Sequence, residues 1–175
     1  LFIEINRKIA KMEIIIRAYK DHDFETLEKI RNDVDLQYSL LVNPKPNTRQ
    51  RVLEWIEKKT SDSDSVFFVI SNEKNDTIGY VQAVSINTLN KNCYVGMVLG
   101  KEWRGKGIFK PAISLVEKYL LNTYNLKKFI AEILESNSDS INAFRNNGYN
   151  LSGTMKEHFY YKSKFHNVCI YEKLL

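Results

Sequence analysis

The sequence predicts a layered α/β (α+β) fold in which a mixed, mostly antiparallel sheet of about seven strands is flanked by about four helices. Three strand-like apolar runs follow one another between residues 66 and 99, separated only by polar turns. A helical pattern over 108–121 then leads to a further strand, which gives one parallel pair. Two last strand-like runs flank residues 162–164, as in a hairpin.

The first part of the chain is predicted to form a strand and two helices. Residues 12–19 are rich in β-branched side chains, which favour a strand. Two aspartates before Phe24 are N-cap candidates for a helical pattern that continues to Leu41. Residues 43–47 contain two prolines and read as a loop, after which Thr48 is the expected cap of the second helix.

Strands dominate the middle of the chain. The runs 66–70, 78–86 and 93–99 are joined by polar turns and predict an antiparallel meander. A helix is expected from Ile108 to about Thr123, with Pro111 near its first turn, where a missing N–H costs little.

The last part alternates strand and helix before the final hairpin. Residues 128–134 read as a strand, and a helix opens at Asn137 or Ser138. Gly148 is a C-cap signal for that helix. The runs 149–161 and 165–174 then complete the predicted sheet.

Composition limits the class of protein. Of the 175 residues, 43% are hydrophobic and 27% are charged, as in ordinary globular proteins. The net charge is +5, but acidic and basic residues alternate, so no nucleic-acid partner is expected and an anionic cofactor is favoured. No apolar run reaches the ~18–20 residues of a membrane span, so no membrane partner is expected.

Two further expectations concern the compartment and the domain boundaries. Cys93 and Cys169 lie far apart in apolar segments, which favours buried free thiols and a reducing cytoplasm over a disulfide or a metal site. Residues 1–11 are expected to be an N-terminal extension that is not necessarily native, because Met12 directly precedes the first strand-like run. Residues 12–175 are expected to form a single domain.

A glycine-containing turn links a strand to a helix in the centre of the chain. The strand-like run 94–99 ends before Gly105 and Gly107, and the helical pattern starts at Ile108. Free N–H groups at a helix start, the helix dipole and glycines without Cβ atoms suit a phosphate group. The sequence therefore predicts that a phosphorylated cofactor binds at this turn.

The order of elements resembles the GNAT superfamily of acetyl-CoA-dependent N-acetyltransferases, and two motifs carry the resemblance. The family loop Gln/Arg-x-x-Gly-x-Gly/Ala aligns with residues 104–109, where Phe109 replaces the last small residue. Residues 137–149 resemble the family segment Asn-x-x-(Ala/Ser)-Ile-x-x-Tyr-x-x-x-Gly-(Phe/Tyr). The tail at 153–168 resembles the branch with ribosomal-protein and spermidine acetyltransferases, which also includes enzymes that acetylate amino sugars.

This resemblance implies a GNAT-like sheet with acetyl-CoA bound where two strands splay apart. The pyrophosphate would meet the loop, and the pantetheine would pair with the strand before it. The residues so implied are Met97, Val98, Leu99, Arg104, Gly105, Lys106, Gly107, Ile108, Phe109, Asn137, Asn142, Phe144 and Arg145.

The chemistry implied is direct attack of an amine on the thioester through a tetrahedral intermediate. A strand amide near Met97 or Val98 would stabilise the oxyanion. Glu132 and His158 are candidates for the base that deprotonates the ammonium group, and Glu157, Tyr160 or a water chain to a more remote carboxylate are the alternatives. In many relatives a Tyr at the position of Phe144 protonates the leaving sulfur of coenzyme A, but Phe144 has no hydroxyl. Here the sulfur must be protonated by water or another group, or coenzyme A must leave as the thiolate.

The sequence leaves the acceptor open. An amino-sugar nucleotide, a polyamine or another small amine, and a protein N-terminus all fit. Polar and aromatic residues expected to line its pocket are Arg31, Asn32, Tyr38, Trp55 and Tyr160. The rival hypotheses are a non-catalytic acetyl-CoA-binding module and, from charge alone, a nucleic-acid-binding domain. A homodimer is compatible with the sequence, which does not determine the oligomeric state.

Overall fold

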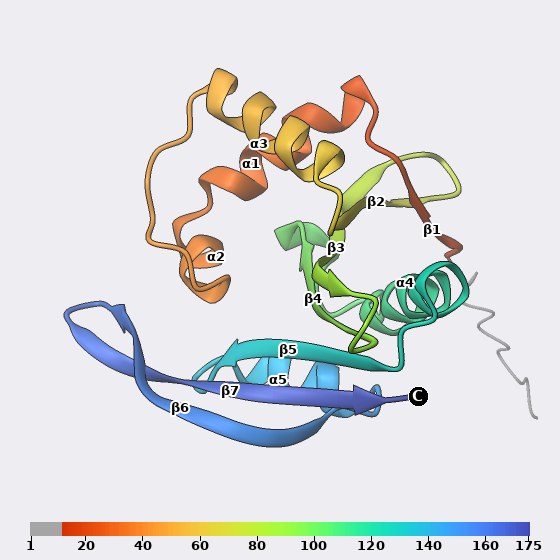
Figure 1. Ribbon diagram of the computed structural model, residues 1–175. Coiled ribbons are helices and arrows are strands. Elements are labelled where there is room, and N and C mark those ends of the chain that lie inside the picture. The colour runs from red at the N-terminus through yellow and green to blue at the C-terminus, as the bar shows by residue number, and fades with distance from the viewer. Residues whose placement is uncertain (1–11) are drawn as a thin grey trace, which may run out of the picture.

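Seven strands form one sheet in the order β1-β2-β3-β4-β5-β7-β6 in the computed structural model, which describes residues 12–175 (Figure 1). The prediction about residues 1–11 lies outside the described residues. The strands are β1 (Ile14–Arg17), β2 (Val66–Asn72), β3 (Thr77–Asn87), β4 (Asn92–Leu99), β5 (Lys128–Leu134), β6 (Asn150–Tyr161) and β7 (Lys164–Leu174).

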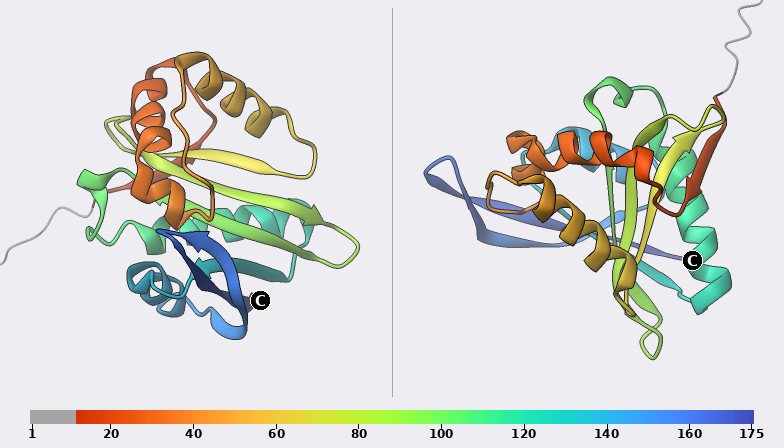
Figure 2. Two further views of the ribbon diagram at one scale, coloured as in Figure 1. Left: turned by 90° about the vertical axis from the view of Figure 1, so that its left-hand side faces the viewer. Right: turned by 90° about the horizontal axis from the view of Figure 1, so that it is seen from above.

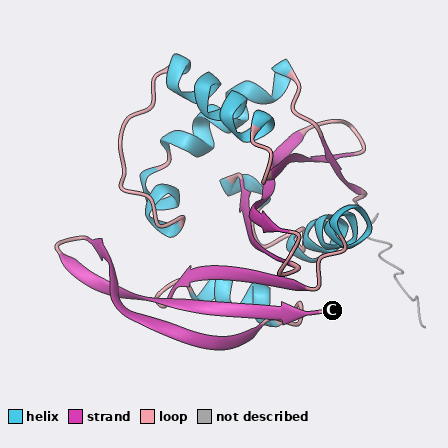
Figure 3. Cartoon of the chain, in the orientation of Figure 1, coloured by secondary structure: helices cyan, strands magenta, loops and turns pink. Residues whose placement is uncertain are grey.

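The described helices are α1 (Phe24–Asn32), α2 (Val34–Ser39), α3 (Arg49–Ser61), α4 (Phe109–Tyr124) and α5 (Ser138–Arg145) (Figure 3). Short 3-10 turns at Asp21–Asp23 and Lys101–Trp103 add to these. Thr48 caps α3, as predicted, because its hydroxyl oxygen accepts a hydrogen bond from Arg51 N. Both the mostly antiparallel sheet and the one parallel pair, β4 with β5, confirm the predicted fold class. In the described part of the chain, no helix is long and apolar enough to cross a membrane.

The helical segment predicted from Phe24 to Leu41 is wrong in one respect, because it is two helices and not one. Asp33 adopts extended backbone angles, φ −75° and ψ 108°, between α1 and α2. Its carboxylate accepts a hydrogen bond from Leu36 N at 3.0 Å and so caps α2. The apolar periodicity continues across this cap, which hides the break in the sequence.

Helices cover both faces of the sheet (Figure 2). On one face, α1 and α3 pack with strand residues that include Tyr80 and Val98, and α2 rests against the same cluster. On the other face, α4 and α5 pack with strand residues that include Val81, Val95 and Ala131. The sheet therefore separates two apolar cores, and any opening through the sheet connects its two sides.

Such an opening exists because β4 and β5 pair over only a short length. Their register partners are Asn92 with Lys128, Cys93 with Phe129, and Tyr94 with Ile130. Beyond these pairs β5 continues along β7, while β4 continues along β3 (Figure 1). From residue 95 to 99, the edge of β4 that faces β5 is therefore unpaired in the described part of the chain, although β3 still pairs with the opposite edge.

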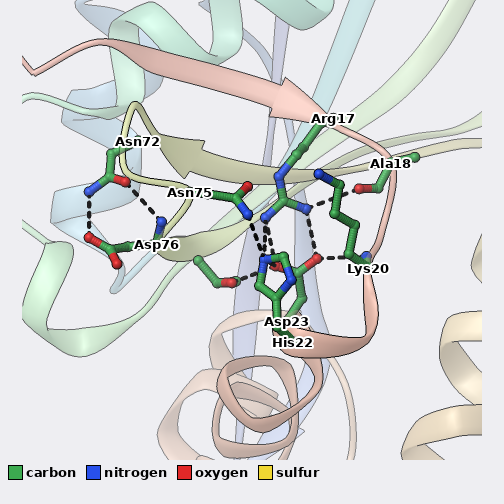
Figure 4. A network of polar contacts seen from close by, with 9 residues as sticks. Arg17, Ala18, Lys20, His22, Asp23, Asn72, Asn75 and Asp76 are labelled. Carbon is green, nitrogen blue, oxygen red and sulfur yellow. Dashed lines mark hydrogen bonds and ion pairs between the residues drawn. The ribbon is translucent and has the colours of Figure 1, made fainter.

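A buried carboxylate ties the first strand to the first helix and to β3 (Figure 4). Both oxygens of Asp23 accept hydrogen bonds from the Arg17 guanidinium, at 2.7 and 2.8 Å. The Lys20 backbone N–H and the Thr77 hydroxyl donate to the same carboxylate. Burial alone would raise the pKa of Asp23, but these hydrogen bonds together lower it from its ordinary value of 3.8.

Candidate active site

A cleft of about 990 Å³ opens where β4 and β5 separate. Its walls come from β3, β4, β5, α2, α5 and the glycine loop 104–109. Among the predicted residues, those that line it are Met97, Val98, Leu99, Arg104, Gly105, Gly107, Ile108, Phe109, Glu132, Asn137, Asn142 and Phe144. The folded chain thus gathers residues from four separate stretches of sequence around one cleft.

The glycine loop presents free backbone donors at the rim of this cleft. Gly105 and Gly107 have positive φ angles of 70° and 74°, which favour glycine over other residues. A Cβ atom at either position would meet no heavy atom within 4 Å, so the space beside the loop is open. Among the described residues, the N–H groups from Gly105 to Ile108 donate no hydrogen bond to another backbone group. These features make the loop a potential anion site.

The loop is fixed to neighbouring elements by Arg104. Its Nε donates a hydrogen bond to the Leu99 carbonyl at 3.2 Å, which joins the loop to the end of β4. Its guanidinium also lies 3.9 Å from the carboxylate of Asp33, the cap of α2. The Arg104 side chain therefore has a structural role in this conformation. Lys106 is exposed at the tip of the loop, and its ammonium group lies 5.0 Å from the centre of the Trp103 ring.

Three aromatic rings connect the loop to α5 and to the core. Phe109 meets Phe144 edge-on, with ring centres 4.9 Å apart, and Phe144 meets Tyr149 in the same way at 4.8 Å. The Tyr149 hydroxyl donates a 2.8 Å hydrogen bond to buried Glu117 of α4, which also pairs with Lys173. Burial, together with the neighbouring Glu117 carboxylate, raises the pKa of Tyr149, so this phenol stays protonated.

Asn137 both caps a helix and lines the cleft. Its side-chain oxygen accepts a hydrogen bond from Ser140 N at 3.2 Å and so caps α5. The same residue lines the cleft. Arg145, at the other end of α5, is exposed and lies outside the cleft lining among the described residues.

The two sides of the cleft carry different residues of β4. Val95 and Met97 pack with the cluster that contains α4, so they face what we call the α4 side. Val98 belongs to the cluster of α1 and α3, and by strand alternation Tyr94 and Gly96 face the same way. We call this the α2 side, because α2 residues line the cleft there.

Glu132 lies on the α2 side. Ile130 is the register partner of Tyr94, and Glu132 follows two residues later, so its side chain leaves the same face of the sheet. It is exposed, lines the cleft and takes part in no ion pair within the described part of the chain. His158, the other predicted base, is exposed on β6, and the cleft lining does not include it.

Comparison with known proteins decides the family. The sequence profile described as "Acetyltransferase (GNAT) domain" matches residues 13–150. This chain belongs to the GNAT acetyltransferase family. The sequence prediction of a GNAT acetyltransferase, with acetyl-CoA as the cofactor that the family uses, is thereby confirmed.

Relatives within the GNAT family match over most of this chain. The spermidine N(1)-acetyltransferase of Vibrio cholerae is 19% identical over 156 residues, which are 89% of this chain and 90% of that protein. The ribosomal-protein-serine acetyltransferase of Escherichia coli is 22% identical over 149 residues, or 83% and 82% of the two chains. Both matches confirm the predicted branch of the family.

A solved structure has the same GNAT fold. The crystal structure of the Vibrio cholerae spermidine N-acetyltransferase in complex with CoA and spermine has a TM-score of 0.85 and 19% identity. It covers 92% of this chain and 95% of that chain. At this level of identity the comparison shows a common fold.

Three of the residues predicted to line the acceptor pocket of this GNAT protein, Arg31, Asn32 and Trp55, contact other parts of the protein. Arg31 lies over the Trp55 ring, 4.7 Å from its centre, and Trp55 packs against Phe67 and Tyr80. Asn32 joins α1 to the loop between α2 and α3, because its side-chain oxygen accepts a 2.9 Å hydrogen bond from the backbone N–H of Asn47. Within the described chain, the cleft lining includes none of these predicted residues.

Of the two predicted tyrosines, Tyr160 lies on β6 near the tip of the β6–β7 hairpin, and Tyr38 lies on α2, which this tip approaches (Figure 1). Tyr38 of α2 meets Tyr161 with ring centres 3.9 Å apart, and Tyr160 meets Phe165 at 5.1 Å. Neither Tyr38 nor Tyr160 is part of the cleft lining in the described chain, and their role in binding stays a prediction.

Sequence reasoning predicted Val98 and Glu132 on the α2 side but missed most of the other residues there. They are Leu36, Ser39, Leu40 and Leu41 from α2 and its end, and Gln82, Val84 and Ser85 from β3. Ser85 has a positive φ of 51° at an irregularity in the pairing of β3 with β4. No motif marks these positions, and only the folded arrangement brings them to the cleft.

Proposed function

We propose that this protein transfers an acetyl group from acetyl-CoA to a primary amine. The observation that carries the proposal is the row of free N–H groups from Gly105 to Ile108 at the rim of the cleft. A pyrophosphate needs such donors, and the unpaired β4 edge beside the loop suits the amide-containing arm of coenzyme A. The opening through the sheet would let an amine approach the acetyl group from the α2 side.

The cofactor fits the residues present. Gly105 and Gly107 leave open space where side chains would otherwise stand. Bound acetyl-CoA supplies an activated thioester to the cleft. We propose that Asn137 and Asn142 offer polar contacts to its arm, and that exposed Lys106 and Arg145 add positive charge outside the cleft. The backbone N–H of Met97 or Val98 would stabilise the negative charge that develops on the thioester oxygen.

Glu132 is the proposed base. An alkyl ammonium with a pKa of about 10 must lose a proton before its nitrogen can attack. Glu132 is on the side from which the amine would enter, and its carboxylate can take that proton directly or through a water molecule. His158 is the alternative base and would need to act from outside the cleft lining.

The leaving group of the reaction is the sulfur of coenzyme A. Phe144 lines the cleft but has no hydroxyl to donate. We propose that coenzyme A leaves as the thiolate or is protonated by water, since a thiol pKa of about 8.5 makes the thiolate a fair leaving group near neutral pH. The Tyr149 hydroxyl is committed to Glu117 and is no substitute.

The relatives direct the choice of acceptor. Spermidine acetyltransferases share the branch, so a polyamine is the first acceptor to test. An amino-sugar nucleotide and a protein N-terminus are the alternatives. The buried thiols of Cys93 and Cys169 fit a reducing cytoplasm as the site of action.

Two measurements test the proposal. Acetyl-CoA should raise the melting temperature of the protein by mass action, and no shift at millimolar cofactor would contradict cofactor binding. Release of free thiol from acetyl-CoA should then depend on an added amine, with spermidine, an amino-sugar nucleotide and a short peptide as the panel. A thermal shift without turnover of any amine would favour the rival, a binding module without activity.

A further inference from the structure

Gln82 carries a buried polar atom without a partner, on the α2 side of the cleft. The residue lies on β3 and lines the cleft. Its side-chain oxygen, Oε1, is buried and has no hydrogen-bond partner among the described residues. Such an atom is uncommon in folded proteins, because it has lost water as a partner and gained nothing in exchange. A half-turn of the carboxamide exchanges this oxygen with Nε2 and turns the acceptor towards the cleft, where a ligand can complete the hydrogen bond.

The position of Gln82 is set by the pairing of β3 with β4. Gln82 is the register partner of Gly96, so both are on the same face of the sheet. A Cβ at Gly96 would come within 3.8 Å of Gln82 Nε2, so the carboxamide lies over the glycine backbone. Towards one end of the pair, Tyr80 and Val98 are buried in the core. Gln82 is therefore the polar group next to that core boundary.

The other end of this pair leads to open space. Val84 and Tyr94 are the next register partners on the same face, and Tyr94 is exposed. Gly96 adds no side chain to the floor between the core and this open end. The Gln82 carboxamide therefore lies over this part of the cleft floor, between the core and the open end.

The two sides of the cleft differ in their charged residues. The charged residues that line the cleft are Arg104, Glu132 and Asp139. Glu132 leaves the same face of the sheet as Gln82, whereas Asp139 is on α5, whose Phe144 packs into the cluster on the α4 side. The α2 side thus offers one carboxylate and one unpaired carboxamide oxygen. An ammonium group has three N–H donors and no acceptor, so it matches both groups.

We propose that Gln82 is an acceptor-binding residue whose carboxamide oxygen accepts a hydrogen bond from the primary amine that is acetylated. Glu132 balances the ammonium charge and takes the proton, after which Gln82 still holds the nitrogen through a remaining N–H. This inference rests on the proposed function and deepens it, because it places the reacting nitrogen on the α2 side beside Gly96.

The test uses the amine of the panel that the wild-type protein acetylates best. Gln82→Leu has a similar size and removes the hydrogen-bond acceptor. The KM for the amine should rise about tenfold or more, because a hydrogen bond to a charged group is lost. The KM for acetyl-CoA should change by less than about twofold, because no cofactor contact is removed. The melting temperature should not fall, since Leu leaves no polar atom unpaired.

Two further variants serve as controls. Gln82→Glu keeps a hydrogen-bond acceptor at the same place, so its KM for the amine should return towards that of the wild type. Gln50→Leu makes the same change on the exposed surface of α3, where the Gln50 side chain donates a hydrogen bond to Glu54, and should alter neither KM.

The outcomes separate this inference from the proposed function. An unchanged KM for the amine in Gln82→Leu, with an active wild type, would overturn the role of Gln82 alone. A KM for acetyl-CoA that rises as much as the KM for the amine, or a clear loss of stability, would also overturn it in favour of a structural role. A wild type that binds acetyl-CoA and acetylates no amine would remove the function and the role of Gln82 together.

Discussion

The ring of Phe109 meets the ring of Phe144 edge-on, with centres 4.9 Å apart. Phe109 replaces the small residue usual at the end of the glycine loop, and its ring packs against α5. The N–H groups of the loop stay free of backbone partners. We expect Phe109→Ala to lower the free energy of unfolding by about 1–3 kcal/mol through lost packing. The Kd for acetyl-CoA, measured by calorimetry, should stay within about threefold, because backbone groups bind the phosphates. A large loss of affinity without loss of stability would place the Phe109 ring on the cofactor.

Gly107 allows a sharper test of the anion site. Its φ of 74° is accessible to Asn and Asp more readily than to most other residues, and a Cβ there meets nothing within 4 Å. Gly107→Asn and Gly107→Asp therefore strain the backbone equally. We expect Gly107→Asp to weaken acetyl-CoA binding at least about tenfold more than Gly107→Asn does, because only Asp repels the phosphates. Equal affinities in a calorimetric titration would remove the pyrophosphate from this loop.

Glu132 and His158 make separable predictions as bases. Glu132→Gln keeps the size of the side chain and should lower kcat by about 10²–10⁴-fold, the range for loss of a general base. His158→Ala should leave kcat within about twofold, because His158 lies outside the cleft lining. Glu57→Gln, on the exposed surface of α3, is the matched control for a lost carboxylate. The opposite ranking of the two kcat values would assign the proton transfer to His158.

Asp23 predicts how stability depends on pH. Its pKa in the folded protein is lower than the ordinary value of 3.8, so it stabilises the fold above that value. This contribution is lost as the pH falls through the lowered pKa of the folded state. Asp23→Ala should cost about 3–5 kcal/mol at pH 7, because Arg17 is left largely buried without its partner.

Denaturant titrations at neutral and acidic pH check this prediction. The difference between wild type and Asp23→Ala should shrink towards the acidic end. Asp21→Ala, an exposed neighbour, should have little effect at either pH. A difference that does not depend on pH would contradict the role of the ionised carboxylate.

The order of the elements could be predicted because periodicity and turn residues report on each segment locally. Gly148, for example, has a positive φ of 89° just after α5, as its C-cap signal predicted. The break at Asp33 could not be predicted, because a cap and a solvated aspartate look alike in a helical pattern. The α4 side of the cleft could be predicted because the glycine loop and the segment 137–149 each carry a recognisable motif.

Most of the α2 side of the cleft, apart from Val98 and Glu132, could not be predicted for a different reason. Gln82 is one polar residue within an ordinary strand, and its unpaired oxygen exists only once β3, β4 and the opening beside β5 are assembled. Trp55 is a contrasting case. An aromatic residue on a helix suggested a pocket, and in the folded protein its partly buried ring packs against Tyr80. Long-range packing decides both cases, and a local pattern contains no record of it.

A structure of the protein with coenzyme A bound tests the central claim most directly. We predict pyrophosphate oxygens within hydrogen-bond distance of the N–H groups from Gly105 to Ile108, and a pantetheine arm paired along the free β4 edge from residue 95 to 99. The thiol should then reach the opening between β4 and β5, facing the side that carries Gln82 and Glu132. Coenzyme A bound outside this cleft, or inside it without contact to the loop N–H groups, would contradict the account.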